Sequence, residues 1–290
     1  MLGPILAITR SVFQAVQYME RKRLVEEFSP IFVQTTTRIF LFIVSILGLI
    51  FLNLTIKNDL FWVYSFISAF IAVIGTTMTT KALKKGDLSI IGPLMVLMPI
   101  LTTISGIFLV NEIPSALGVL GIIVIAIGGY ISHLDTHNLK NSQPFKKIIH
   151  NPNIQLAVSA IVLLSIGNGF QKLAINNSDI VTNIIAFGIF YFSISLVIML
   201  NFNKNAKQDI NTVLKHPKHP IIGGIAQTVS TVLAQATFGL MNIGYATSLF
   251  RTSMIFQVYL GGKYFKEKNM KQRIIGTIII LMGAVMIVFA

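Results

Sequence analysis

Long stretches of mostly apolar residues follow one another along this chain, and short polar segments separate them. A bilayer core is about 30 Å thick, so a helix that crosses it needs about 20 apolar residues. Ten stretches meet this need, at 2–20, 30–53, 60–80, 87–110, 113–132, 154–172, 179–200, 219–241, 244–262 and 272–290. The pattern therefore predicts an all-α integral membrane protein with ten transmembrane helices.

The composition supports this fold class. Hydrophobic residues make up 54% of the 290 positions and charged residues only 11%, against roughly 25% charged in ordinary soluble domains. A membrane β-barrel would show apolar and polar residues alternating with period two, whereas backbone polar groups in lipid are satisfied internally by helices. The chain contains no cysteine, which excludes disulfides and thiolate metal sites.

An internal repeat divides the chain into two halves. Four positions, Gly106, Glu112, Gly121 and Gly128, recur with identical spacing as Gly261, Glu267, Gly276 and Gly283. This match predicts two five-helix repeats, residues 1–133 and 153–290. Glycines seven apart lie on one helix face, so we expect them to serve close helix packing.

The charge distribution indicates that the two repeats are inverted. When the loops between predicted helices are numbered in order, and Lys172 and Arg273 at helix ends are counted with the loops beside them, the odd-numbered loops hold 18 of the 23 Lys and Arg residues and the even-numbered loops hold 2. The positive-inside rule then places the odd loops in the cytoplasm and both termini outside. The net charge of +13 is thus mostly a topology signal, and no nucleic-acid partner is expected.

The sequence resembles the drug/metabolite transporter superfamily, in particular its ten-helix EamA-like members. The similar positions are Ala82-Leu83-Lys84-Lys85-Gly86, Pro93, Pro99, Asn111-Glu112, Gly121, Gly128, Ser29-Pro30 and Arg38. The resemblance implies a transporter of metabolites such as amino acids, nucleotide sugars, sugar phosphates or nucleosides. The chain departs from the family pattern at Met254, where a proline is expected. The predicted external termini also differ from the family's usual cytoplasmic ones.

Three arginines, Arg10, Arg38 and Arg251, lie inside predicted spans, whereas all ten acidic residues fall in predicted loops or at helix boundaries. An intramembrane arginine costs at least ~2.5 kcal/mol on insertion, so a compensating environment is expected. A polar cavity that binds an anionic solute would provide one, because the guanidinium fork matches carboxylate and phosphate. The alternative is snorkelling of these long side chains toward the membrane surface.

Other polar side chains recur at helical spacing within the spans, so each group shares one helix face. The candidate substrate-binding residues are Arg10, Gln14, Gln17 and Tyr18 in the first span, Gln34 and Arg38 in the second, Asn168 in the sixth, Gln227, Thr231 and Gln235 in the eighth, and Arg251 in the ninth. Hydrogen bonds between helices are the alternative explanation for the Gln and Thr stripes.

These observations predict a secondary transporter that moves a small anionic or zwitterionic metabolite, such as an amino acid, by alternating access. The alternatives are an organic-cation or drug exporter of the same fold, or a lipid-carrier translocase or membrane enzyme. No enzymatic activity or cofactor is expected, because no Ser/His/Asp or paired-carboxylate arrangement stands out within a span. No metal is expected either, since the pair His133 and His137 lacks an assured third ligand. The expected setting is a bacterial inner membrane, as a monomer or homodimer, with the small-molecule substrate and the lipid bilayer as partners.

Overall fold

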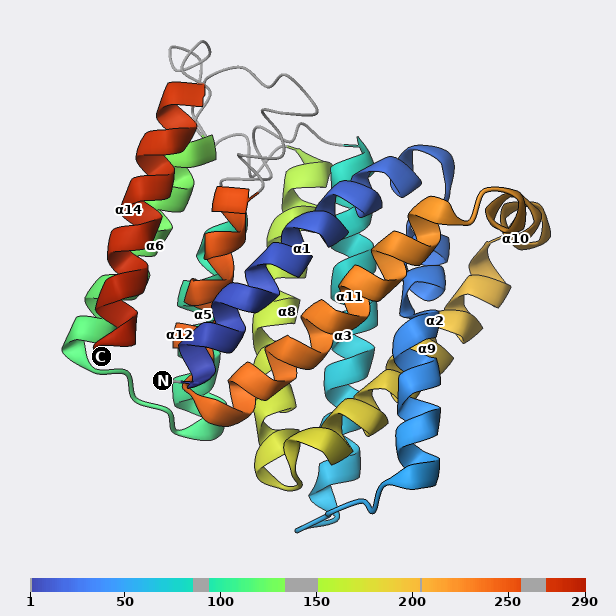
Figure 1. The fold of residues 1–290 in the computed structure, drawn as a ribbon, viewed down its shortest axis with the longest axis horizontal. Helices are drawn as coiled ribbons and strands as arrows, with labels where there is room; N and C mark the ends of the chain where they lie inside the picture. Colours follow the sequence, from blue (N-terminus) through green and yellow to red (C-terminus); the bar gives the residue numbers. More distant parts are fainter. Residues whose placement is uncertain (1, 86–93, 134–150, 204, 257–269) are drawn as a thin grey trace.

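The computed structural model describes residues 2–85, 94–133, 151–203, 205–256 and 270–290. Every regular element in these ranges is a helix, and the long helices lie side by side (Figure 1). The helices are α1 (Leu2–Glu27), α2 (Pro30–Phe51), α3 (Leu60–Lys85), α5 (Leu97–Ser105) with the π-helix η1 (Gly106–Val110), α6 (Ala116–His133), α8 (Pro152–Asn176), α9 (Ile180–Phe202), α10 (Ala206–Lys215), α11 (Lys218–Leu240), α12 (Ile243–Leu249) with the 3₁₀ turn η3 (Phe250–Thr252), and α14 (Met270–Val288). The predicted all-α class is confirmed.

Five helices of the described ranges are long and apolar enough to cross a membrane: α2, α3, α8, α9 and α11. Three shorter apolar helices accompany them, Leu97–Val110, Ala116–Ser132 and Gln272–Val288. The protein is therefore an integral, multi-pass membrane protein. The number of ten spans stays a prediction, because parts of the fourth and ninth lie outside the described residues and α1 carries several polar side chains.

Helix boundaries follow from local capping. The side chain of Ser29 accepts a hydrogen bond from the backbone of Phe32, and Pro30 begins α2. Asn151 and Pro152 start α8 in the same way. Short polar side chains of this kind satisfy helix N–H groups that have no partner within the helix, and proline is tolerated in the first turn.

The first helix is longer than the sequence pattern predicted. It was expected to end near residue 20, but α1 continues to Glu27. Arg21, Lys22 and Arg23, assigned to a loop, are therefore helical. The charged residues of this segment are good helix formers. The helix ends shortly before Pro30, because a proline disfavours the α conformation of the residue that precedes it.

The segment 201–218, expected to be a loop, contains the short helix α10. Figure 1 shows α10 nearly end-on, beside the ends of α9 and α11. Ile210 and Leu214 are exposed on it, whereas Val213 packs against a buried cluster that contains Leu41 and Tyr191. Its few apolar positions could not indicate a membrane span, so the sequence analysis passed over a helix that is only ten residues long.

Helix packing follows a regular scheme. The most extensive contacts join α6 with α14, α3 with α8, α1 with α11 and α2 with α9. A two-fold relation between residues 1–133 and 153–290 would exchange α1 with α8, α2 with α9 and α3 with α11. That exchange turns the α1–α11 contact into the α8–α3 contact. The α2–α9 and α6–α14 contacts are each unchanged, because the two helices of each pair exchange with one another. The observed contacts are therefore compatible with two halves related by a two-fold axis. The inverted repeat itself remains a prediction.

The paired glycines lie where α6 meets α14. A Cβ atom added to Gly128 would lie 2.7 Å from the carbonyl oxygen of Gly276, and one added to Gly276 would lie 2.5 Å from that of Gly128. Gly121 and Gly283 face each other in the same way. The two helices are therefore antiparallel and nearly in backbone contact, which confirms the predicted packing role. Gly261 and Glu267, the other members of that repeat, lie outside the described residues.

Candidate functional site: a cavity lined by arginines

A cavity of about 290 Å³ lies between helices of the two predicted repeats. Its volume equals that of roughly ten water molecules, which suits a small metabolite. Ten of the eleven predicted site residues line it: Arg10, Gln14, Gln17, Tyr18, Arg38, Asn168, Gln227, Thr231, Gln235 and Arg251. The structure thus brings together side chains from α1, α2, α8 and α11. Figure 1 shows where these helices, which are far apart in the sequence, lie in the fold.

Gln34 is the exception, because it is fully buried and does not line the cavity. Its side-chain nitrogen lies 2.7 Å from the hydroxyl of Thr80, and its oxygen accepts a hydrogen bond from the Tyr191 hydroxyl at 3.2 Å. Helical spacing correctly placed Gln34 on the same side of α2 as Arg38. It could not show that α3 and α9 would cover that part of the helix.

Arg21 is a lining residue that the sequence analysis missed. Its guanidinium donates a hydrogen bond to the side-chain oxygen of Gln227 at 2.8 Å. The error follows from the misplaced end of the first helix. Arg21 lies seven residues after Gln14 and four after Gln17, so it continues the polar face of α1. That spacing was the available signal.

Two of the arginines are held against aromatic rings. The Arg10 guanidinium lies 3.7 Å from the centre of the Phe250 ring, and that of Arg38 lies 4.2 Å from the centre of the Tyr191 ring. Arg10 also donates to the backbone oxygen of Ser230 at 3.2 Å. Such cation–π contacts fix a guanidinium without neutralising its charge.

The positive charges of the cavity lack carboxylate partners within the described ranges. The ion pairs found there join Arg23 and His219 to Glu20, and Lys172 to Glu112. Arg10 nevertheless lies within electrostatic range of Arg38 and Arg251, and Arg21 within range of Arg38. Four guanidinium groups therefore share one small cavity, a higher density of positive charge than the sequence analysis expected.

Phe238 and Phe250 also line the cavity, and their ring centres are 5.7 Å apart. Beside Phe238, the buried amine of Lys172 lies 3.0 Å from a carboxylate oxygen of Glu112 and donates to the carbonyl oxygens of Phe238 and Met241. These contacts join α8, the end of η1 and the turn between α11 and α12.

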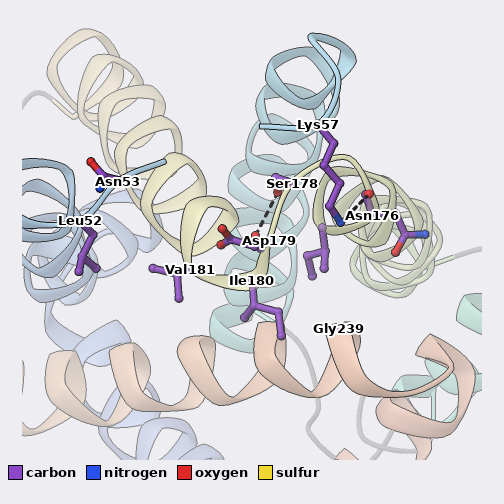
Figure 2. A pocket seen from close by; sticks show the side chains of 10 residues that line it. Leu52, Asn53, Lys57, Asn176, Ser178, Asp179, Ile180, Val181 and Gly239 are labelled. Atoms are coloured by element: carbon purple, nitrogen blue, oxygen red, sulfur yellow. Dashed lines mark hydrogen bonds between the residues drawn. The ribbon is translucent and has the colours of Figure 1, made fainter. Parts of the chain in front are cut away.

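A second recess, of about 700 Å³, opens at the surface where the loop after α2 meets the start of α9 (Figure 2). There the Lys57 amine donates to the backbone oxygen of Asn176 at 3.4 Å. Burial raises the pKa of Asp179, but hydrogen bonds from Thr182, Thr55 and Val181 outweigh it and hold that pKa below its usual value. None of the predicted site residues lines this recess.

The comparisons with known proteins agree with this architecture. Residues 1–133, which contain α1 to α6, match the EamA-like transporter family. The chain carries an EamA-like transporter domain. A solved crystal structure whose description states no function covers 98% of this chain and 94% of its own, with a TM-score of 0.70 and 14% identity. That likeness shows a shared fold for the EamA-like domain and the rest of the chain. No curated protein matches.

Together these findings identify a multi-pass membrane transporter of the drug/metabolite type. The resemblance noted in the sequence is confirmed. The EamA-like domain contributes Arg10, Arg21 and Arg38 to the cavity, whereas Arg251 comes from the remainder of the chain.

Proposed function

We propose that this transporter moves a small polar metabolite, anionic or zwitterionic, across a bacterial inner membrane. The halves 1–133 and 153–290 act as inverted repeats that rock around the cavity in alternating access. The observation that carries the proposal is the set of four guanidinium groups in one cavity, none of them in an ion pair within the described ranges. Buried charges of one sign require compensation, and a bound anion supplies it.

Substrate binding is assigned to the ten lining residues named above together with Arg21. Gln34 has a supporting role, since it orients Tyr191, the ring beneath Arg38. The functional unit is a monomer or homodimer, and its odd-numbered loops face the cytoplasm.

Transport of organic cations is the main alternative, because aromatic rings attract cations. The Phe250 and Tyr191 rings already carry Arg10 and Arg38 on their faces, so an organic cation would meet positive charge there. A membrane enzyme would need a nucleophile with its base, or a metal cluster. The described residues hold no group of three potential metal ligands among His, Cys, Asp and Glu.

A ligand-stabilisation screen on the detergent-purified protein tests the proposal. Bound ligand raises the apparent unfolding temperature by mass action. We expect organic anions or zwitterions to stabilise the wild type, and Arg10→Ala and Arg38→Ala to reduce that shift strongly. Arg23→Ala is the matched control, because Arg23 is paired with Glu20 and does not line the cavity. Equal stabilisation of all four proteins would contradict the assigned site.

A further inference from the structure

Three side-chain amide oxygens of the cavity lining are occupied by the protein's own donors. The side-chain oxygen of Gln14 accepts from Arg10 at 2.7 Å, and that of Gln227 accepts from Arg21 at 2.8 Å. The side-chain oxygen of Gln235 accepts from Asn183 at 2.8 Å. These three amide oxygens are therefore already engaged within the protein.

The spare polar groups of the lining are donors. Four buried nitrogen atoms of lining residues have no hydrogen-bond partner within the described ranges: Nε of Arg38, Nε2 of Gln171, Nε2 of Gln235 and Nε of Arg251. A buried donor without a partner is unfavourable, because its lost hydration is not replaced. A ligand rich in acceptor oxygens would satisfy these groups.

The unsatisfied arginine donors come from both halves of the chain. Arg38 belongs to α2 and holds the Thr231 hydroxyl at 2.6 Å, whereas Arg251 belongs to η3 and contacts the sulfur of Met98, a weak acceptor. Arg10 lies within electrostatic range of both. One negative charge on a ligand would leave most of this positive charge without compensation.

We infer that the solute is an organic anion with at least two negative charges and no ammonium group, either a dicarboxylate or a phosphate monoester. The inference rests on the proposed function and narrows its substrate class. Charged oxygen atoms form short, strong hydrogen bonds with guanidinium groups, often two at once. An amino acid would bring an ammonium group next to four positive charges, where the described lining residues provide no carboxylate to receive it.

The test compares four-carbon probes that differ in their number of carboxylate and ammonium groups. Apparent affinities are taken from unfolding midpoints at fixed pH and ionic strength for succinate, aspartate, butyrate and 4-aminobutyrate. Glycerol 3-phosphate is added as a phosphate monoester. We expect succinate or glycerol 3-phosphate to bind at least tenfold more tightly than the other probes. If succinate binds more tightly, the solute is a dicarboxylate, and if glycerol 3-phosphate binds more tightly, it is a phosphate monoester.

Variants connect this preference to the cavity. Arg38→Gln and Arg251→Gln should each reduce the preference for the dianion to about twofold or less, while Arg23→Gln keeps it. Arg38→Lys retains the charge and should retain most of the preference, which separates the loss of charge from misfolding.

Three kinds of result overturn the inference. Tighter binding of aspartate or 4-aminobutyrate would show a zwitterion site and leave the proposed function intact. Binding of an organic cation, such as tetraphenylphosphonium, with none of the anions would overturn both proposals. Failure of both dianions to stabilise the wild type would also count against the inference.

Discussion

Lys172 and Glu112 form an ion pair in which both side chains are mostly buried, with 9% and 16% of their surfaces exposed. Glu112→Gln would leave the Lys172 charge without its carboxylate, and removing one partner of a buried pair costs about 3–5 kcal/mol. We therefore expect a clear fall in the apparent unfolding temperature of the purified protein. Arg23→Gln, which breaks a pair whose arginine is 40% exposed, should cost less than about 1 kcal/mol. Similar effects of the two changes would contradict the structural role of the Glu112 pair.

Asp179 supports a pH-dependent prediction. Its pKa is lowered in the folded protein, so folding favours the ionised carboxylate. That stabilisation is fully present above the usual pKa of an aspartate and is lost as the pH falls through the lowered value. Wild type should therefore unfold at a higher temperature than Asp179→Asn near neutral pH, and acidification should narrow the difference. A difference that does not change with pH would contradict this effect of Asp179.

The individual residues of the cavity were predictable where helical periodicity applied. Charged and amide side chains in apolar spans are costly in lipid, and their spacing showed which of them share a helix face. Gln34 and Arg21 were misassigned because their surroundings depend on where a helix ends and which helix covers it. The contacts of Arg10 with Phe250 and of Arg38 with Tyr191 depend on tertiary packing and could not be inferred.

The contact between α6 and α14 gives a prediction for whole helices. Gly276→Ala would place a methyl group 2.5 Å from the backbone oxygen of Gly128, which cannot move without shifting the helix. Overpacking of this kind typically costs about 1–3 kcal/mol. Gly3→Ala is the control, because the atom that it meets first is the side-chain sulfur of Met241, which can move. An equal loss of thermal stability in both variants would contradict a tight α6–α14 contact.

The helices themselves were largely predictable, because apolar stretches of membrane length have few other solutions in lipid. Their ends were less so. The basic residues after position 20 predicted a loop, but in the structure this segment continues α1 to Glu27. The helix α10 depends on contacts such as that of Val213 with a buried cluster, which no local pattern reports.

The orientation of the whole molecule is open to a direct test, since the chain contains no cysteine. Asn58 and Lys207 are exposed and lie in segments between predicted spans, Lys207 within α10, that the charge pattern assigns to opposite sides of the membrane. In intact cells, a membrane-impermeant maleimide should label Asn58→Cys, whereas Lys207→Cys should react only after permeabilisation. The reverse result would place both termini in the cytoplasm, as is usual in the resembling family.

The arrangement of the whole molecule was only partly predictable. Repeated glycines and reversed loop charges indicated two inverted halves, which stay a prediction, and the observed helix pairing is compatible with them. The sequence did not indicate that Arg21 would be the fourth arginine of the cavity, or that the side-chain oxygens of Gln14, Gln227 and Gln235 would accept hydrogen bonds from the protein's own donors.

Counterflow in proteoliposomes tests whether the arginine-lined cavity carries an anion across the membrane. Vesicles preloaded with the most strongly stabilising unlabelled anion are diluted into the labelled form, and uptake is followed over time. We predict saturable uptake by the wild type and by Arg23→Gln, and its loss in Arg38→Gln with the folded protein still present. Uptake that persists unchanged in Arg38→Gln and Arg10→Ala, or uptake of an organic cation alone, would contradict the proposed site and substrate.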